Sequence, residues 1–75
     1  MNIEHLVSMA NDIGNFFDGE FGPKDSPAHI AMHISRYWDP RMRSQIIAHA
    51  AERGEGLSTS ALAAVRTLAP PPVRN

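Results

Sequence analysis

His29 and His33 come closest to a metal site in type and spacing, because they lie four positions apart in the run HIAMH. On a helix, this spacing puts two imidazoles on one face, where both can bind the same ion. The glutamate of a metalloprotease helix is missing, and Ala31 stands in its place. A third ligand would have to come from His5 or His49, and no spacing indicates that either lies nearby. We therefore favour two histidines on the flank of an amphipathic helix and predict no metal ligand.

Other catalytic arrangements have little support in the sequence. The chain has no cysteine to act as a nucleophile, and no serine lies in a Gly-x-Ser-x-Gly elbow. Paired carboxylates would need a cleft, which a chain of 75 residues can hardly form. The run GEG at residues 54–56 lacks the lysine and the glycine spacing of a phosphate-binding loop and is typical of a turn. We predict no catalytic and no cofactor-binding residue in this chain.

The segment SRYWDPRMRSQ, residues 35–45, has a composition suited to binding another protein. It holds the only Trp, the only Tyr and three of the seven basic residues. These residue types dominate the hot spots of protein interfaces. Two arginines at the start of a helix also oppose the helix dipole, so helix stability alone does not explain them. We predict a docking surface formed by Arg36, Tyr37, Trp38, Asp39, Arg41 and Arg43.

A structural role is the alternative for part of this segment. Trp38 can fill the core between two helices, and for this residue alone core packing is the favoured interpretation. Arg43 can pair locally with Asp39. For Arg41 and Arg43, docking and a solvated charge both remain open.

Nucleic-acid binding is a weaker alternative. Two helices joined at Asp39-Pro40, with arginines on the second, loosely suggest a helix-turn-helix. Residues 1–25 hold five acidic residues and one lysine, whereas residues 26–75 hold six arginines and three acidic residues. The net charge of the chain is −1, so the basic footprint expected of a nucleic-acid-binding domain is thin. We do not expect nucleic acid as a partner.

The length of the chain favours a single domain with a marginal core. About 60% of the unfolded surface is buried in a domain of this size, and without cysteine no disulfide can stabilise it. Such a domain is a candidate for stabilisation by a partner. The start, MNIEHLV, has no basic region, and no apolar stretch is long enough to span a bilayer. We expect a cytoplasmic protein without a membrane segment.

Apolar spacing and capping residues predict an all-α fold. We expect a small bundle of three main helices plus a short C-terminal helix and an irregular Pro-rich tail. Residues 1–69 would form the single domain and residues 70–75 the tail, mobile or bound to a partner. The first helix is expected over residues 3–18, with Asn2 as its N-cap and Gly19 as its end. Residues 19–26 are expected to form a loop.

The second helix is predicted to begin with Ser26 as N-cap and Pro27 as first residue, and to run to about residue 38. Its inner face would hold Ile30, Ile34 and the pair Tyr37/Trp38.

The third helix is predicted over residues 40–53, with Asp39 as N-cap and Gly54 after its end. Its inner stripe would be Met42, Ile46, Ile47 and Ala50. A short fourth helix would follow Ser58, and its stripe would be Leu62, Val65 and Leu68.

Three runs carry a resemblance to a known family: MNIEHLVSMANDIGNFF, RYWDPRMRSQIIAH and GEGLS. In this order and spacing they resemble the delta subunit of NAD-dependent, molybdenum-containing formate dehydrogenase. The similarity covers residues 1 to about 68. The loop GEFGPKDS and the tail APPPVRN look unlike the family's usual sequence, and Tyr37 replaces an expected Phe.

The resemblance implies an accessory subunit without a cofactor of its own. In the family's complex, formate is oxidised to carbon dioxide in the alpha subunit, at molybdenum held by a bis-pterin guanine dinucleotide. Electrons then pass through iron–sulfur clusters to FMN in the beta and gamma subunits, which reduce NAD. The delta subunit is expected to bind the alpha subunit directly and to support its stability, assembly or cofactor retention. A transient factor for assembly or cofactor insertion in the same enzyme is the alternative.

Overall fold

Four helices account for most of residues 2–69, the part of the chain that this computed structural model describes. They are α1 (Ile3–Phe21), α2 (Ser26–Tyr37), α3 (Pro40–Glu52) and α4 (Thr59–Arg66). No strand occurs in residues 2–69, so the predicted all-α fold is confirmed. The predicted Pro-rich tail, residues 70–75, lies outside the described residues. Within residues 2–69, no helix combines the length and the apolar character needed to cross a membrane.

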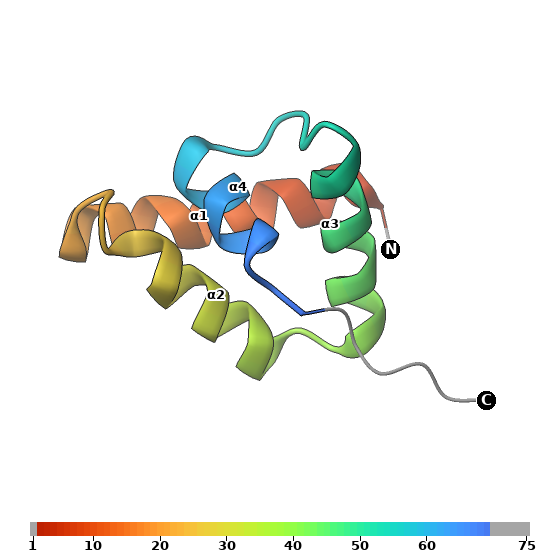
Figure 1. The fold of residues 1–75 in the computed structure, drawn as a ribbon, viewed down its shortest axis with the longest axis horizontal. Helices are drawn as coiled ribbons and strands as arrows, with labels where there is room; N and C mark the ends of the chain where they lie inside the picture. The colour runs from red at the N-terminus through yellow and green to blue at the C-terminus, as the bar shows by residue number, and fades with distance from the viewer. Residues whose placement is uncertain (1, 70–75) are drawn as a thin grey trace.

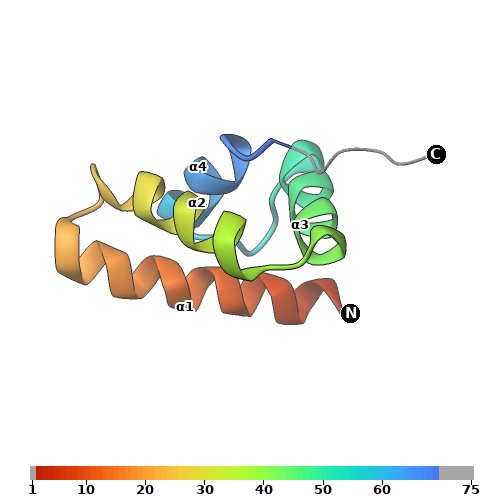
Figure 2. The ribbon, with the colours of Figure 1, turned by 90° about the horizontal axis from the view of Figure 1, so that it is seen from below.

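The longest helix, α1, forms the base on which the other three helices pack. α2 returns alongside α1, and α3 lies across the end of the molecule where α1 begins (Figure 1). α4 lies in the angle between α2 and α3 (Figure 1), and seen from below it lies toward the edge of the molecule opposite α1 (Figure 2). The shortest helix therefore contacts all three others and is central to their packing.

Side chains cap three of the four helices at the predicted residues. The side-chain oxygens of Asn2, Asp39 and Ser58 accept hydrogen bonds from backbone N–H groups of α1, α3 and α4, at 2.8, 2.9 and 3.2 Å. Each bond satisfies a backbone donor that has no partner within its own helix. These three helix starts confirm the sequence prediction.

The start of α2 differs from the prediction by one residue. Ser26 is the first helical residue, and Asp25 takes the N-cap position without a side-chain hydrogen bond. The Ser26 N–H donates to the Gly22 carbonyl at 3.0 Å, and its side chain is fully buried. Because this bond already satisfies the Ser26 N–H, the loop itself supports the helix start in place of a serine cap.

The end of α1 also differs from the prediction, because the helix passes through Gly19 and ends at Phe21. Gly22 ends it, with a φ of 84° and an N–H that donates to the carbonyl of Asp18. A glycine inside a helix costs only about 1 kcal/mol. The extra turn places Phe21 next to Phe17, with ring centroids 6.0 Å apart, and this contact favours the longer helix.

The inner face of α4 consists of small side chains. Ala61, Ala64 and Val65 are buried, whereas Leu62 and Leu68 are only partly buried. The predicted stripe of Leu62, Val65 and Leu68 is therefore only partly right. Within residues 2–69, the buried apolar residues are Leu6, Ala10, Ile30, Ile34, Trp38, Ile46, Ala50, Ala61, Ala64 and Val65.

Small residues prevail in α4 because the helix lies against α1 at Gly14. A Cβ added to Gly14 would lie 3.8 Å from the Cβ of Ala61 and 3.5 Å from the Oγ of Ser58. The two helices are close enough that a leucine in place of Ala61 would have no room without a shift of the backbone. Burial thus follows the available space more closely than the hydrophobicity of each residue.

The side chain of Asn11 fixes the loop between α3 and α4. Its Nδ2 donates to the carbonyl of Gly56 at 2.8 Å, and its Oδ1 accepts from the N–H of Ser58 at 2.8 Å. One side chain of α1 thereby provides a donor for the Gly56 carbonyl and an acceptor for the Ser58 N–H. Because Ser58 is also the N-cap of α4, these bonds set where the central helix begins.

Gly54 forms the turn that leads out of α3. Its φ is 65°, in the left-handed region that disfavours residues with a side chain, and its N–H donates to the carbonyl of His49 at 2.9 Å. A Cβ at this position would lie only 2.4 Å from Cδ1 of Leu62. The backbone conformation therefore favours glycine here, and the side chain of Leu62 would have to shift to accommodate a Cβ.

Replacing Gly54 with Ala is expected to lower the free energy of unfolding by about 1–3 kcal/mol, because alanine is strained in this conformation. Gly19→Ala is the matched control: Gly19 is helical and exposed, no atom lies within 4 Å of the added Cβ, and the change should stabilise by up to about 1 kcal/mol. Urea unfolding followed by circular dichroism measures both. Equal effects of the two substitutions would contradict the role assigned to Gly54.

Replacing Asn11 with Ala is expected to cost about 1–3 kcal/mol of unfolding free energy, since it leaves the Ser58 N–H and the Gly56 carbonyl without their partners. Asn15→Ala, an exposed change one turn further along α1, should have little effect. Thermal unfolding of both variants tests this expectation. A melting temperature for Asn11→Ala equal to that of the Asn15 control would contradict it.

Candidate protein-docking surfaces

The predicted docking segment, residues 35–45, forms an elbow between two helices. α2 ends at Tyr37, Trp38 is extended with ψ at 138°, and Pro40 begins α3. The carboxylate of Asp39 accepts a hydrogen bond from the N–H of Met42. The predicted junction at Asp39-Pro40 is confirmed, because only two residues separate the end of α2 from the start of α3.

Two of the predicted docking residues are used inside the elbow itself. Trp38 is 4% exposed and belongs to the core, as expected for a residue that packs between the helices. Arg43 is half-buried, and its Nη1 donates to the backbone carbonyl of Trp38. From the sequence, Asp39 was the expected local partner of Arg43. In the structure, Arg43 instead bonds to the carbonyl of Trp38, directly after α2.

Arg36, Tyr37 and Arg41 are exposed. Tyr37, which the sequence placed with Trp38 on the inner face of α2, is 71% exposed, so this part of the prediction is wrong. Trp38 lies beyond the helix in an extended conformation that turns its ring into the core, and Tyr37 remains on the outer side of α2. The ring centroid of Tyr37 lies 4.8 Å from that of His33.

A second candidate surface covers the end of α1 and the outer side of α2, and of its residues the sequence had singled out only Tyr37 for docking. We call it the aromatic face. Its exposed members are the four large apolar or aromatic residues Phe16, Phe21, Met32 and Tyr37, which are 61%, 48%, 60% and 71% exposed. Phe17, His29 and His33 pack between them.

The rings of the aromatic face form one connected set. Phe21 and His29 stack with their centroids 3.8 Å apart and their planes 8° from parallel. Phe17 contacts Phe16 at 5.3 Å, His29 at 5.6 Å and His33 at 6.1 Å. Such ring pairs contribute about 0.5–1.5 kcal/mol each beyond their burial, so the face is held in place before any partner arrives.

The two histidines at metal-ligand spacing therefore serve as packing elements of the aromatic face. His29 lies on Phe21, and His33 lies between Phe17 and Tyr37. Within residues 2–69, no group of three His, Cys, Asp or Glu side chains is placed to hold a metal ion. His29 packs on rings of α1, and His33 joins Phe17 of α1 to Tyr37 of α2.

Two adjacent hollows lie in the aromatic face. The first has a volume of about 320 Å³, and its lining residues are Asp12, Ile13, Phe16, Phe17 and His33. The second has a volume of about 140 Å³, and its lining residues are Phe17, His29, Met32, His33, Arg36 and Tyr37. Phe17 and His33 line both, so they form the ridge between a mainly apolar hollow and one that carries a cation.

The sequence did contain a signal for this surface. Phe16 and Phe17 are neighbours on a helix, where successive residues point about 100° apart, so a single narrow stripe cannot bury both rings. Met32 lies two residues from both Ile30 and Ile34, on the side of α2 away from the core. Apolar residues outside the core stripe therefore marked the exposed face.

The opposite end of the molecule carries three hollows that share His49 as a lining residue. Their other lining residues include the carboxylates of Glu4, Glu52 and Glu55 and the apolar side chains of Ile3, Val7 and Ala48. The Nε2 of His49 lies 2.7 Å from the carbonyl oxygen of Glu55, in a hydrogen bond that closes the turn after α3. His49 thus has a local structural role.

Comparison with known proteins yields one family. The model of the family described as NADH-dependent formate dehydrogenase delta subunit FdsD matches residues 5–65 of the 75-residue chain. The match spans both candidate surfaces and the loop held by Asn11. No curated protein and no solved structure matches.

Arg43→Ala is expected to lower the free energy of unfolding by about 1 kcal/mol more than Arg41→Ala, because only Arg43 loses a charge-assisted hydrogen bond. Both substitutions remove a cation from the first turns of α3, so any gain from the helix dipole is similar in the two. Chemical unfolding of the two single variants gives the difference. Identical midpoints would show that the bond to the Trp38 carbonyl contributes nothing in solution.

Proposed function

The chain belongs to the family of NADH-dependent formate dehydrogenase delta subunits, and from this premise we propose that it is a non-catalytic accessory subunit. It docks on the large, molybdenum-containing alpha subunit of a cytoplasmic complex and supports the stability, assembly or cofactor retention of that subunit. The molybdenum cofactor with its bis-pterin guanine dinucleotide, the iron–sulfur clusters, FMN and the NAD site are proposed to lie in the alpha, beta and gamma subunits.

The observation that carries this proposal is the aromatic face. Four large side chains are between 48% and 71% exposed and gather on one side of α1 and α2. Leaving such a patch in water has a free-energy cost, and contiguous exposed apolar patches mark surfaces that bind other proteins. A subunit that is always bound in a complex would keep this patch covered.

The use of the polar side chains agrees with a role in binding and not in catalysis. Asp39 caps α3, His49 closes the turn before Gly56, and Arg43 bonds to the carbonyl of Trp38. Each of these groups, which could act as an acid, a base or an anion ligand, has a backbone partner. We therefore propose that the chain contributes shape and contact area, and that the reaction takes place in the neighbouring subunits.

Purification from native cells through an N-terminal tag on this chain tests the proposal. We expect the alpha, beta and gamma subunits, identified by mass, in near-stoichiometric amounts, with molybdenum, iron and flavin in the same sample and NAD reduction that depends on formate. Recovery of this chain alone would contradict the accessory role. Recovery with metal-free apoenzyme only would favour the transient assembly factor.

A further inference from the structure

We propose that the aromatic face, with Arg36 beside it, carries the main contact with the partner subunit, and that residues 38–45 of the elbow do not. The occupant is a segment of that subunit that presents one large apolar side chain next to a carboxylate. This inference rests on the proposed function and adds to it the surface and the chemistry of the contact.

The first hollow provides the apolar half of the contact. Its volume of about 320 Å³ accommodates a large apolar side chain, and its walls are formed mainly by Ile13, Phe16 and Phe17. Burying a Leu, Phe or Met side chain there removes apolar surface from water and so favours binding. The exposed ring of Phe16 would be covered at the same time, so both proteins lose apolar surface to water.

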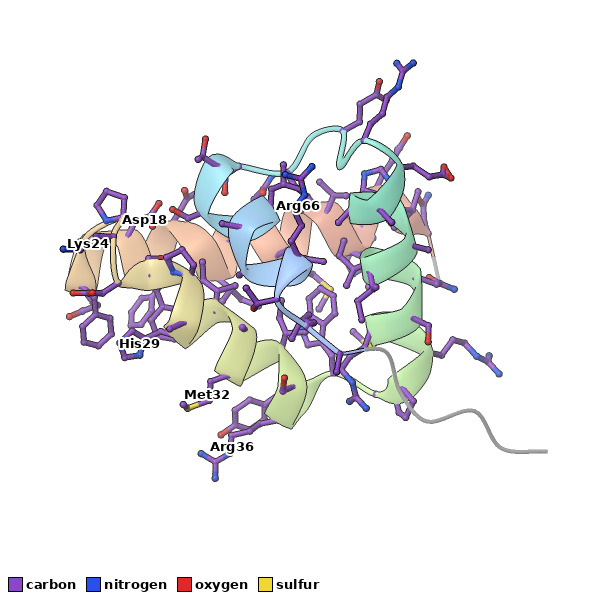
Figure 3. The ribbon with its side chains drawn as sticks, in the orientation of Figure 1. Asp18, Lys24, His29, Met32, Arg36 and Arg66 are labelled. Carbon is purple, nitrogen blue, oxygen red and sulfur yellow. The ribbon has the colours of Figure 1, made fainter. Side chains whose placement is uncertain are left out.

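The second hollow provides the polar half. It is smaller, about 140 Å³, and Arg36 lines it together with the two histidine rings and Tyr37. Figure 3 shows His29, Met32 and Arg36 on the same outer side of α2, with the guanidinium of Arg36 extending away from the molecule. A guanidinium presents a planar set of donors that matches a carboxylate, and it binds one more strongly when apolar neighbours exclude water. An acidic side chain is therefore the complement of this hollow.

The rigidity of the face favours a tight contact. The rings of Phe17, Phe21 and His29 already pack on one another, so binding does not have to order them. Aromatic and arginine side chains in preorganised pockets are the residues that dominate binding energy at interfaces. The side chains of the elbow are less available to a partner. Trp38 is buried, and Asp39 and Arg43 form hydrogen bonds with backbone groups of the elbow itself.

The size of the face argues for a larger partner over a second copy of this chain. With about 200 Å² for a fully exposed large side chain, its four exposed members offer roughly 500 Å². A stable interface buries about 800 Å² on each partner. Two copies meeting through this face alone would fall short of that area. A large subunit can cover the aromatic face and continue over the adjoining surfaces of α1 and α2.

The test is a titration of this chain into the remaining subunits of the complex, purified without it. Phe16→Gln combined with Met32→Gln should weaken binding at least tenfold. Both positions are exposed and helical, and Gln keeps a high helix propensity, so the variant should stay folded. The matched control is Ala48→Gln with Ala63→Gln, two exposed helical positions outside the aromatic face, which should bind like the wild type.

A second pair of variants tests the predicted carboxylate. Arg36→Glu should weaken binding more than Arg36→Gln, by a further factor of about ten at low salt, because it places two negative charges together. Equal effects of the two would overturn the acidic complement. Undiminished binding of the Phe16/Met32 variant, or a loss seen only with Arg41→Ala, would overturn the assignment of the face.

Two further outcomes are distinct from these. If the wild-type chain alone forms a dimer that the Phe16/Met32 variant abolishes, the face belongs to a second copy and the inference is wrong. If the wild-type chain does not bind the other subunits at all, the proposed function fails together with the inference. This outcome is visible from the wild-type chain alone, so it is distinct from a failure of the inference only.

Discussion

The carboxamide of Asn11 is the constraint on which the arrangement of the other elements depends. It bonds to the carbonyl of Gly56 and the N–H of Ser58, which lie 45 and 47 residues further along the chain. These two bonds fix the loop that precedes α4. α4 has only eight residues and is too short to be stable by itself in water. The position of α4 follows from its N-cap and from its contacts with the other helices. Asn11 provides two hydrogen bonds from α1 to the loop at the start of α4.

A consequence of this design is a division between the two sides of α2. One side packs against α1 and α4 through Ile30 and Ile34, which are fully buried. The other side carries Met32 and Arg36 outward and stacks His29 and His33 on the rings of α1. A helix of twelve residues thus serves the core with one face and the proposed contact with the other.

Local signals in the sequence predicted the helices well, because caps and breakers act within a few residues. Asn2, Asp39 and Ser58 cap helices as predicted, and Gly54 ends α3. The misplaced end of α1 has a longer-range cause, since the contact of Phe17 with Phe21 and the stacking of Phe21 on His29 outweigh the weak helix-breaking tendency of Gly19.

The candidate site was predicted less well, and for a physical reason. Composition drew attention to the elbow, but it does not say whether an aromatic or charged side chain is already engaged within the fold. Trp38 and Arg43 are engaged, which only the three-dimensional contacts reveal. Conversely, Phe16 and Met32 are ordinary apolar residues in the sequence, and they become notable because the core stripe leaves them outside. The docking role of either surface stays a prediction.

The neighbouring positions of Tyr37 and Trp38 give the chain two natural optical labels with different surroundings. The single tryptophan is inside the core and the single tyrosine is on the aromatic face. In the isolated chain, tryptophan emission should therefore respond to unfolding, whereas tyrosine absorbance should respond to whatever covers the outer side of α2. Two adjacent residues allow the loss of structure and the covering of the surface to be followed separately, without any attached dye.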